Sequence, residues 1–412
     1  MDSSATTSSA ESAHKVLVPS REGFLWGAAT AAHQVEGNNI ANDWWHLEHS
    51  GSEVIAEPSG DAADHFHRWP EDLDLLASLG LNAYRFSLEW SRIEPEKGFF
   101  SNAAIEHYRK MVAGCLVRGL APIVTLHHVT LPLWFRRQGG WSSPEAAELF
   151  ARFTTKVLPA LEGVEWVCTI NEPGMQPMIS RLHAGDPEAL KAWTGGGMPV
   201  PTPREIDELI SAHHSATEIL HAETDAKVGW TVSIADLQYD DAGRVHADAW
   251  FEKYEGPFLR ASRGDDFIGI QNYFRTVFDK DGVVPLPSGA RMTDIWEFYP
   301  EALGNSLRVA WETTDHTPIL VTENGIPTND DTLRVEFMDR ALTSLTGAMN
   351  DGVDVRGYLH WSALDNFEWA LGYGPRFGLI EVDPVTFERR LKPSAHHYAA
   401  LVTQATSVHP QL

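Results

Sequence analysis

The sequence predicts an α/β fold, a single (β/α)8 TIM barrel with the active site at the C-terminal ends of the strands. Eight short apolar segments alternate with segments of helical periodicity, which implies parallel βαβ units. Eight strands in one undivided chain favour a closed barrel. A doubly wound open sheet is the alternative fold, but no GxGxxG or GxxxxGK[ST] motif follows an early strand.

The predicted strands are mostly continuous apolar runs. This pattern is typical of parallel strands that are covered on both faces, whereas half-exposed strands alternate apolar and polar residues. The eight predicted strands are Phe24–Ala29, Ala83–Leu88, Pro122–Leu126, Trp166–Ile170, Lys227–Val232, Phe267–Ile270, Ile319–Thr322 and Val355–His360.

Helical periodicity fills the segments between these strands. Apolar residues recur every three or four positions over 66–76 and 105–115, as they do on the buried face of a helix. A further helix is expected to start at Ser143–Glu145, where a capping hydroxyl is followed by proline and an acidic residue. The segment Arg334–Met349 predicts another helix.

The chain divides into a short tail and one catalytic domain. Residues 1–19 are predicted to be a disordered tail, because their first part is rich in Ser, Ala and Thr, and residues 20–412 to form the barrel. The tail lacks the basic start and apolar stretch of a secretory signal. No segment approaches eighteen uninterrupted apolar residues, so no membrane span is predicted. We therefore expect a cytoplasmic protein.

Charge and cysteine content limit the possible partners. The formal net charge of −25 repels phosphate backbones and anionic lipid, which argues against nucleic acid and membrane partners. A small-molecule substrate is expected, and the chain could be a monomer or a homo-oligomer. The two cysteines, Cys115 and Cys168, lie in apolar stretches without metal-ligand spacing. We expect no metal and no cofactor.

Polar and aromatic residues follow the predicted strands where each strand ends. In a closed parallel barrel these positions meet at one rim, where the chemistry of such barrels is placed. The residues at these positions include Gln34, Arg85, His127, His128, Asn171, Glu172, Gln271, Tyr273, Glu323, Trp361, Glu368 and Trp369.

Two of these rim residues are carboxylates on opposite sides of the predicted barrel. Glu172 ends the fourth strand and Glu323 the seventh, so the two could face each other across the mouth. Glycoside hydrolysis needs such a pair: one acid protonates the leaving oxygen, and the other carboxylate attacks or activates water. A lone glutamate here would more often cap a helix, but two among amides and indoles favour chemistry.

Tryptophan is abundant, with 15 residues, and supports a sugar ligand. The apolar face of a sugar ring stacks on indole, while its hydroxyls need fixed donors and acceptors. Trp166, Trp230 and Trp311 are expected in the core. The indoles expected near the rim are Trp45, Trp90, Trp134, Trp141, Trp361 and Trp369.

These rim residues lie in motifs that resemble glycoside hydrolase family 1, the β-glucosidase and β-galactosidase family. The motifs are FLWGAATAAHQVEG, YRFSLEWSRI, TINEP, VTENG and LHWSALDNFEW, and they occur in this order over nearly the whole chain. The resemblance implies a retaining, exo-acting β-glycosidase. Such an enzyme removes terminal non-reducing β-D-sugars through a covalent glycosyl-enzyme.

The resemblance also implies roles for individual residues. Glu172 matches the acid/base and Glu323 the nucleophile, whose carboxyl groups should lie about 5–5.5 Å apart. The remaining matches are Arg85 and Tyr273 beside the nucleophile, Asn171 at the sugar 2-hydroxyl, Gln34 and Glu368 at the far hydroxyls, and His128, Trp361, Trp369 and Gln271 as further sugar-binding positions. In this arrangement Arg85 and Tyr273 would keep Glu323 ionised, while burial would keep Glu172 protonated.

The sequence also departs from the family pattern. Val129 and Thr130 stand where an aromatic residue and an aspartate are common, and the loop over 174–203 has an unusual composition. The aglycone preference is therefore not inherited. Glu368 would repel a sugar phosphate, so a neutral sugar is predicted: glucose first, with galactose and fucose tolerated.

Three other functions share part of this pattern. An endo-acting glycanase of the same superfamily is disfavoured by Gln34 and Glu368, which close the end of the pocket. A non-catalytic sugar-binding barrel would be expected to lose a carboxylate. A transglycosylating member of the same family would share every residue named above.

Overall fold

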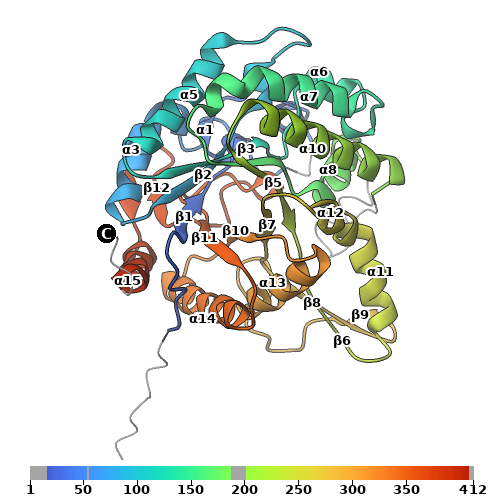
Figure 1. Cartoon of the computed structure of the whole chain (residues 1–412), viewed down its shortest axis with the longest axis vertical. Helices are drawn as coiled ribbons and strands as arrows, with labels where there is room; N and C mark the ends of the chain where they lie inside the picture. Colours follow the sequence, from blue (N-terminus) through green and yellow to red (C-terminus); the bar gives the residue numbers. More distant parts are fainter. Residues whose placement is uncertain (1–15, 53–54, 187–200, 408–412) are drawn as a thin grey trace, which may run out of the picture.

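The computed structural model describes residues 16–52, 55–186 and 201–407, and it confirms the predicted barrel. Eight parallel strands close in the order β1-β11-β10-β7-β5-β4-β3-β2, with helices around them (Figure 1). The barrel strands are β1 (Leu25–Ala29), β2 (Ala83–Ser87), β3 (Ala121–His127), β4 (Trp166–Asn171), β5 (Lys227–Ser233), β7 (Ile268–Gln271), β10 (Ile319–Asn324) and β11 (Val355–Trp361).

Each of the eight predicted strands is present, and several run further at their C-terminal ends than predicted. The strand β4 includes Asn171, β7 includes Gln271, and β10 includes Glu323. These polar residues join the backbone pairing, and Glu323 pairs in register with Gln271. Asn171, Gln271 and Glu323 are therefore carried on barrel strands, and Glu172 directly follows one.

The helices surround the barrel and bury one apolar face each. Their bounds are α1 (Ala32–Glu36), α2 (Asp43–Glu48), α3 (His65–Ser78), α4 (Trp90–Ile93), α5 (Asn102–Leu116), α6 (Leu133–Arg137), α7 (Ala146–Val157), α8 (Gln176–His183), α10 (Pro203–Glu223), α11 (Arg244–Tyr254), α12 (Gly256–Ala261), α13 (Ala302–Thr313), α14 (Asp331–Asn350) and α15 (Pro393–Ser407). The segments predicted as helical all lie within these elements.

One predicted helix start is wrong. The prediction placed Ser143 at the cap and Pro144 in the first helical position, but α7 begins at Ala146. A short 3-10 turn over Gly140–Ser142 precedes it, and the Ser143 hydroxyl accepts the Glu145 backbone N–H at 3.3 Å. The serine thus closes a local turn instead of capping the helix, a competing use of short hydroxyl side chains.

Two small sheets lie outside the barrel and were not predicted. One contains β6 (Asp236–Tyr239), β8 (Arg275–Asp279) and β9 (Gly282–Val283), and the other is the hairpin of β12 (Ile380–Val382) and β13 (Arg389–Leu391). The first sheet follows the ends of β5 and β7 and lies beside α11 (Figure 1). This sheet therefore positions α11 and α12 at the mouth of the barrel.

The predicted tail over residues 1–19 falls mostly outside the described residues and stays a prediction. Its last part lies against α14, where the Leu17 backbone hydrogen-bonds to the hydroxyls of Thr343 and Thr346. Within residues 16–52, 55–186 and 201–407, no helix is both long and apolar enough to cross a membrane.

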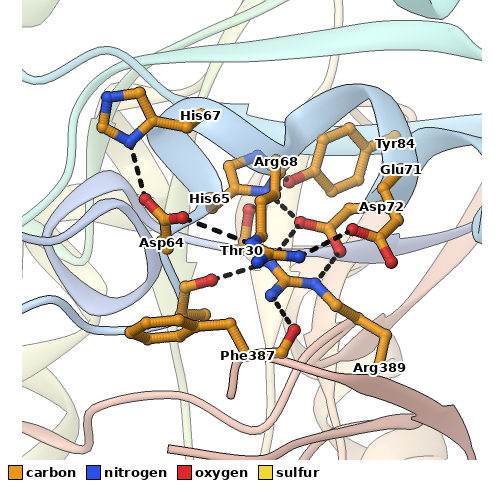
Figure 2. A network of polar contacts seen from close by, with 11 residues as sticks. Thr30, Asp64, His65, His67, Arg68, Glu71, Asp72, Tyr84, Phe387 and Arg389 are labelled. Carbon is orange, nitrogen blue, oxygen red and sulfur yellow. Dashed lines mark hydrogen bonds and ion pairs between the residues drawn. The ribbon is translucent and has the colours of Figure 1, made fainter. Parts of the chain in front are cut away.

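A buried polar network fastens the β12–β13 hairpin to the barrel (Figure 2). Asp72 on α3 accepts two hydrogen bonds from the guanidinium of Arg389, at 2.8 and 3.0 Å. His65 Nδ1 lies 2.7 Å from the same carboxylate, and its Nε2 lies 3.2 Å from the Tyr84 hydroxyl on β2. The hydroxyl of Thr30 extends this network of hydrogen bonds and lies 2.6 Å from the Tyr84 hydroxyl.

We expect Asp72→Asn to destabilise the fold by about 3–5 kcal/mol, because it leaves the buried Arg389 without its counter-charge. Burial raises the pKa of Asp72, but hydrogen bonds from His65 and Arg389 outweigh it and leave the pKa lowered. A lowered pKa stabilises the fold above the unfolded pKa of about 3.9, and the contribution disappears as pH falls through the folded pKa. The difference in urea stability between wild type and variant should therefore shrink in acid.

The matched control is Asp74→Asn on the same helix. Asp74 is exposed and pairs with Arg118 at the surface, so its replacement should leave urea unfolding nearly unchanged. Equal effects of the two substitutions would contradict the assigned role of Asp72.

Candidate active site

A cavity opens at the carboxyl end of the barrel, where the predicted rim residues meet. Eight of the predicted residues line it, and three more are buried. The lining residues among them are Gln34, His128, Glu172, Tyr273, Glu323, Trp361, Glu368 and Trp369. The other three, Arg85, Asn171 and Gln271, are each at most 1% exposed, and Arg85 and Asn171 contact the lining residues Glu323 and His128.

Glu323 on β10 is held by two donors, Arg85 on β2 and Tyr273 just after β7. Its Oε1 accepts a hydrogen bond from Arg85 Nη1 at 2.6 Å, and its Oε2 accepts one from the Tyr273 hydroxyl. Burial raises the pKa of Glu323, and Arg85 and Tyr273 offset part of that rise. The carboxylate is therefore fixed in orientation, with its charge balanced by a guanidinium.

Asn171 is the centre of a second group of hydrogen bonds. Its Oδ1 accepts from Arg85 Nη2 at 2.6 Å, from the Thr231 hydroxyl at 2.7 Å and from Gln271 Nε2 at 2.8 Å. Its Nδ2 lies 3.3 Å from His128 Nε2. Gln271 thus orients Asn171 from behind and does not line the cavity, which differs from the sugar-binding position expected for it.

Glu172 sits at the end of β4 in a left-handed backbone conformation, with φ of 47°. Its backbone N–H donates to the Thr231 carbonyl at 2.8 Å, and its carboxyl hydrogen-bonds to Ser233. Burial and then the negative charge of Glu323 raise the pKa of Glu172 to about 8. The two glutamates therefore stand in one cavity with unlike surroundings, which is how a pair of carboxyls is given two roles.

Gln34 and Glu368 meet at the far end of the cavity. Gln34 Nε2 donates to Glu368 Oε2 at 3.2 Å and to the Phe367 carbonyl at 2.9 Å. Burial, and then the charges of Glu323 and Glu172, raise the pKa of Glu368 well above its ordinary value. Glu368 thus adds a further hydrogen-bonding carboxyl to the cavity, beside Gln34.

Aromatic rings form one side of the cavity. His128 is nearly parallel to Trp361 and to Trp369, with ring centroids 6.0 and 6.5 Å apart. His33 stacks behind Trp369 at 5.7 Å and is itself fixed by Glu48, 2.9 Å away. These rings give the cavity the flat apolar surface on which a sugar ring can stack.

Several polar atoms of the cavity wall are buried and have no hydrogen-bond partner within the described part of the chain. They are Gln34 Oε1, Trp44 Nε1, His128 Nδ1 and Trp296 Nε1. Buried polar atoms are nearly always paired, so these are positions where the hydroxyls of a ligand would complete the bonding.

Of the six indoles predicted near the rim, Trp361 and Trp369 line the cavity and the other four do not. Trp90, Trp134 and Trp141 pack with Phe135 in the layer between the barrel and its helices. Trp45 stacks on His49 and does not line the cavity. Proximity to a strand end indicated the height of these residues in the barrel but not the direction of their side chains.

The cavity also contains residues that the sequence analysis did not assign to it. Trp44, Ser233, Trp250, Glu255 and Trp296 all line it. Ser233 ends β5 and could have been found by the strand-end rule that found Asn171 and Glu323. The others lie on α2, on α11 and its junction with α12, and in the loop after β9, where no spacing in the sequence pointed to the site.

Two unlike carboxyls, amide donors and stacked aromatic rings at the mouth of a (β/α)8 barrel define a glycoside hydrolase. The chain belongs to glycosyl hydrolase family 1, whose family model matches residues 18–235 and 265–407. It is therefore a β-glycosidase of a family that retains the anomeric configuration.

Individual relatives agree with this assignment. A β-glucosidase from Agrobacterium sp. is 31% identical over 92% of this chain and 94% of its own. A bifunctional β-D-glucosidase/β-D-fucosidase from Bifidobacterium breve is 31% identical over 92% of this chain and 97% of its own. The crystal structure of the β-glycosidase BGL167 superposes with a TM-score of 0.85 and 42% identity, covering 95% of this chain and 98% of that one.

Proposed function

We propose that the protein removes terminal β-D-glucosyl residues by double displacement, with Glu323 as nucleophile and Glu172 as acid/base. The observation that carries the proposal is the contrast between the two carboxyls. Glu323 is clamped by Arg85 and Tyr273. Glu172 has a pKa raised to about 8, so it holds a proton at neutral pH.

In the first step Glu323 attacks the anomeric carbon while Glu172 gives its proton to the glycosidic oxygen. The aglycone leaves as a neutral alcohol, and Glu323 becomes an ester of the sugar. The negative charge of Glu323 disappears in this ester, and that charge was one cause of the raised pKa of Glu172. Glu172 is therefore easier to ionise in the intermediate.

In the second step the Glu172 carboxylate removes a proton from water, which attacks the anomeric carbon. The ester bond to Glu323 breaks, and the sugar leaves with its original β configuration. Glu172 ends protonated and Glu323 ionised, so both residues return to their starting states. The proton that left with the aglycone is replaced by one from water.

The sugar is held by the remaining predicted residues. Gln34 and Glu368 bind the hydroxyls furthest from the anomeric carbon, and Asn171 binds the 2-hydroxyl through its amide. Trp361 and Trp369 supply the stacking surface with His128. An ionised Glu368 carboxylate would repel a phosphate group on the sugar. Even beside a protonated Glu368, the phosphate would lose its hydration on burial, so the site favours a neutral sugar.

The proposed test is a panel of 4-nitrophenyl glycosides. We expect the β-D-glucoside to be hydrolysed fastest and the β-D-galactoside to be accepted. The β-D-fucoside should also be accepted, as the name of the Bifidobacterium breve relative suggests. The α-D-glucoside and the β-D-glucoside 6-phosphate should not be hydrolysed. Faster turnover of the 6-phosphate, or internal cleavage of long cellulose chains, would contradict the proposal.

Tyr273→Phe is expected to lower kcat/KM for the β-glucoside by about 10- to 100-fold, the usual effect of losing a hydrogen bond to a charged group. Losing this donor also raises the pKa of Glu323, because the hydrogen bond from Tyr273 lowers it. The acid limb of the kcat/KM profile should therefore move to higher pH. Tyr239→Phe, at an exposed position outside the cavity, is the control and should change neither quantity.

A further inference from the structure

The cavity extends beyond Glu172, on the side where the aglycone leaves. The chain after Glu172 is in direct contact with the end of α11: a Cβ atom at Gly174 would lie 2.6 Å from the Tyr254 carbonyl oxygen. The junction of α11 and α12, with Trp250, Tyr254 and Glu255, therefore forms the wall next to the proton donor. Since Glu172 protonates the oxygen of the leaving group in the proposed mechanism, the leaving group would contact this wall.

Glu255 is a buried carboxyl in this wall that the mechanism above does not use. It is 4% exposed, and its Oε1 accepts the Ala235 backbone N–H at 3.1 Å. Trp250 also hydrogen-bonds to it, and burial raises its pKa to about 8. No cationic side chain within the described ranges forms an ion pair with it.

The segment Ser233–Ala235 at the end of β5 contacts both Glu172 and Glu255. Ser233 hydrogen-bonds to Glu172, and Ala235, two residues further along the same segment, donates to Glu255. Both carboxyls thus contact the segment at the end of β5 and line the same cavity. Glu172 meets the glycosidic oxygen, and Glu255 lies where the body of the aglycone would be.

The surroundings of Glu255 are flat and apolar. Trp250 hydrogen-bonds to Glu255 and packs on Tyr254, with ring centroids 4.8 Å apart, and Phe274 and Trp296 line the same cavity. Flat rings favour a flat partner, and a single buried carboxyl among them offers one strong, directional hydrogen-bonding position. The family match is interrupted over residues 236–264, the segment that contains Trp250, Tyr254 and Glu255.

We propose that Glu255 determines leaving-group specificity by hydrogen-bonding to a neutral hydroxyl on a flat aromatic aglycone. This inference rests on the proposed function and adds the substrate class: β-glucosides of hydroxylated phenols. The apolar rings stack on the phenol, and the carboxyl of Glu255 pairs with its free hydroxyl. A protonated carboxyl both donates to and accepts from such a hydroxyl.

The chemistry of the wall favours a hydroxyl over a cation. A carboxyl without a counter-charge in an apolar wall is kept neutral by desolvation, and a neutral carboxyl gives no charge to attract an ammonium group. A bare phenyl group would leave the carboxyl facing an apolar edge, which costs binding free energy.

The test compares three substrates that differ at one group: 4-hydroxyphenyl, 4-methoxyphenyl and 4-(aminomethyl)phenyl β-D-glucoside, together with their 3-substituted isomers. For at least one position we expect wild-type kcat/KM to be about tenfold higher with the hydroxyl than with the methoxy group. Glu255→Leu should reduce this ratio to about one, and Glu255→Gln, which keeps a donor and an acceptor, should retain most of it. Glu252→Gln, an exposed position on α11 paired with Arg260, is the control and should leave the ratio unchanged.

Activity on 2,4-dinitrophenyl β-D-glucoside separates the two proposals. Its leaving group departs without protonation, so the second step limits the turnover rate, and no aglycone is present in that step. Wild type and both Glu255 variants should share the same kcat on it. If wild type fails to hydrolyse this substrate, the proposed function itself is wrong.

Two results would overturn the role of Glu255 while leaving the glucosidase intact. One is a wild-type hydroxyl-to-methoxy ratio near one at both positions, which needs no variant and is independent of folding. The other is a preference for the aminomethyl substrates over the hydroxyl ones. A ratio that Glu255→Leu leaves unchanged would also contradict the assignment.

Discussion

Replacing Glu323 by glycine is expected to lower kcat for 4-nitrophenyl β-D-glucoside by on the order of 10⁶-fold, the effect seen when a catalytic nucleophile is removed. Among the described residues, Glu323 is the carboxyl that receives hydrogen bonds from both Arg85 and Tyr273. Steady-state rates at matched enzyme concentration measure the loss.

The space left by Glu323→Gly also allows a positive test. Azide added to the variant can attack the anomeric carbon from the side that Glu323 occupied, while Glu172 still donates its proton. The expected product is α-glucosyl azide, with inverted configuration, identified by proton NMR. Wild type should not form this α-azide, and a β-azide from the variant would contradict the assigned position of the nucleophile.

Glu172→Gln is expected to have different effects on the two steps. With 2,4-dinitrophenyl β-D-glucoside the first step needs no proton donor, whereas the second loses its general base and slows by about 10²- to 10⁴-fold. The covalent intermediate should then accumulate, and rapid mixing should show a burst of dinitrophenol equal to the enzyme concentration. A slow first step with this substrate, and no burst, would contradict the role of Glu172.

The same substitution should change the pH profile. Burial and the charge of Glu323 raise the pKa of Glu172 to about 8. An acid catalyst is active when protonated, so wild-type kcat/KM for a poor leaving group should fall as pH rises above about 8. Glutamine does not titrate, so the alkaline limb should be absent in Glu172→Gln. An alkaline limb that persists unchanged would assign it to another group.

The barrel and its two glutamates were predictable for a physical reason. Parallel strands covered on both faces must be apolar along their whole length, so β3, β4 and β10 stand out as continuous runs. Polar residues directly after such runs must lie on one rim, and this places Glu172 and Glu323 in one cavity. The rule depends only on strand ends and needs no knowledge of side-chain direction.

The parts that could not be predicted depend on tertiary contacts. Trp90 and Trp250 are the same residue type, yet Trp90 packs behind the barrel and Trp250 lines the cavity. The strands β6 and β8 are short and half exposed, so they lack the apolar signal of the barrel strands. Since this small sheet carries α11, the position of Glu255 could not be predicted from the sequence.

The most direct test of the account is covalent trapping of the intermediate. In 2-deoxy-2-fluoro-β-D-glucosyl fluoride the 2-fluorine slows both steps, while the reactive fluoride leaving group keeps the first step fast enough for the glycosyl-enzyme to accumulate and inactivate the protein. Peptide mass spectrometry is expected to locate one fluoroglucosyl unit on the peptide that contains Glu323, attached at that residue. Label on Glu172 or on another residue, or hydrolysis with no covalent adduct and an α-configured first product, would contradict the central claim.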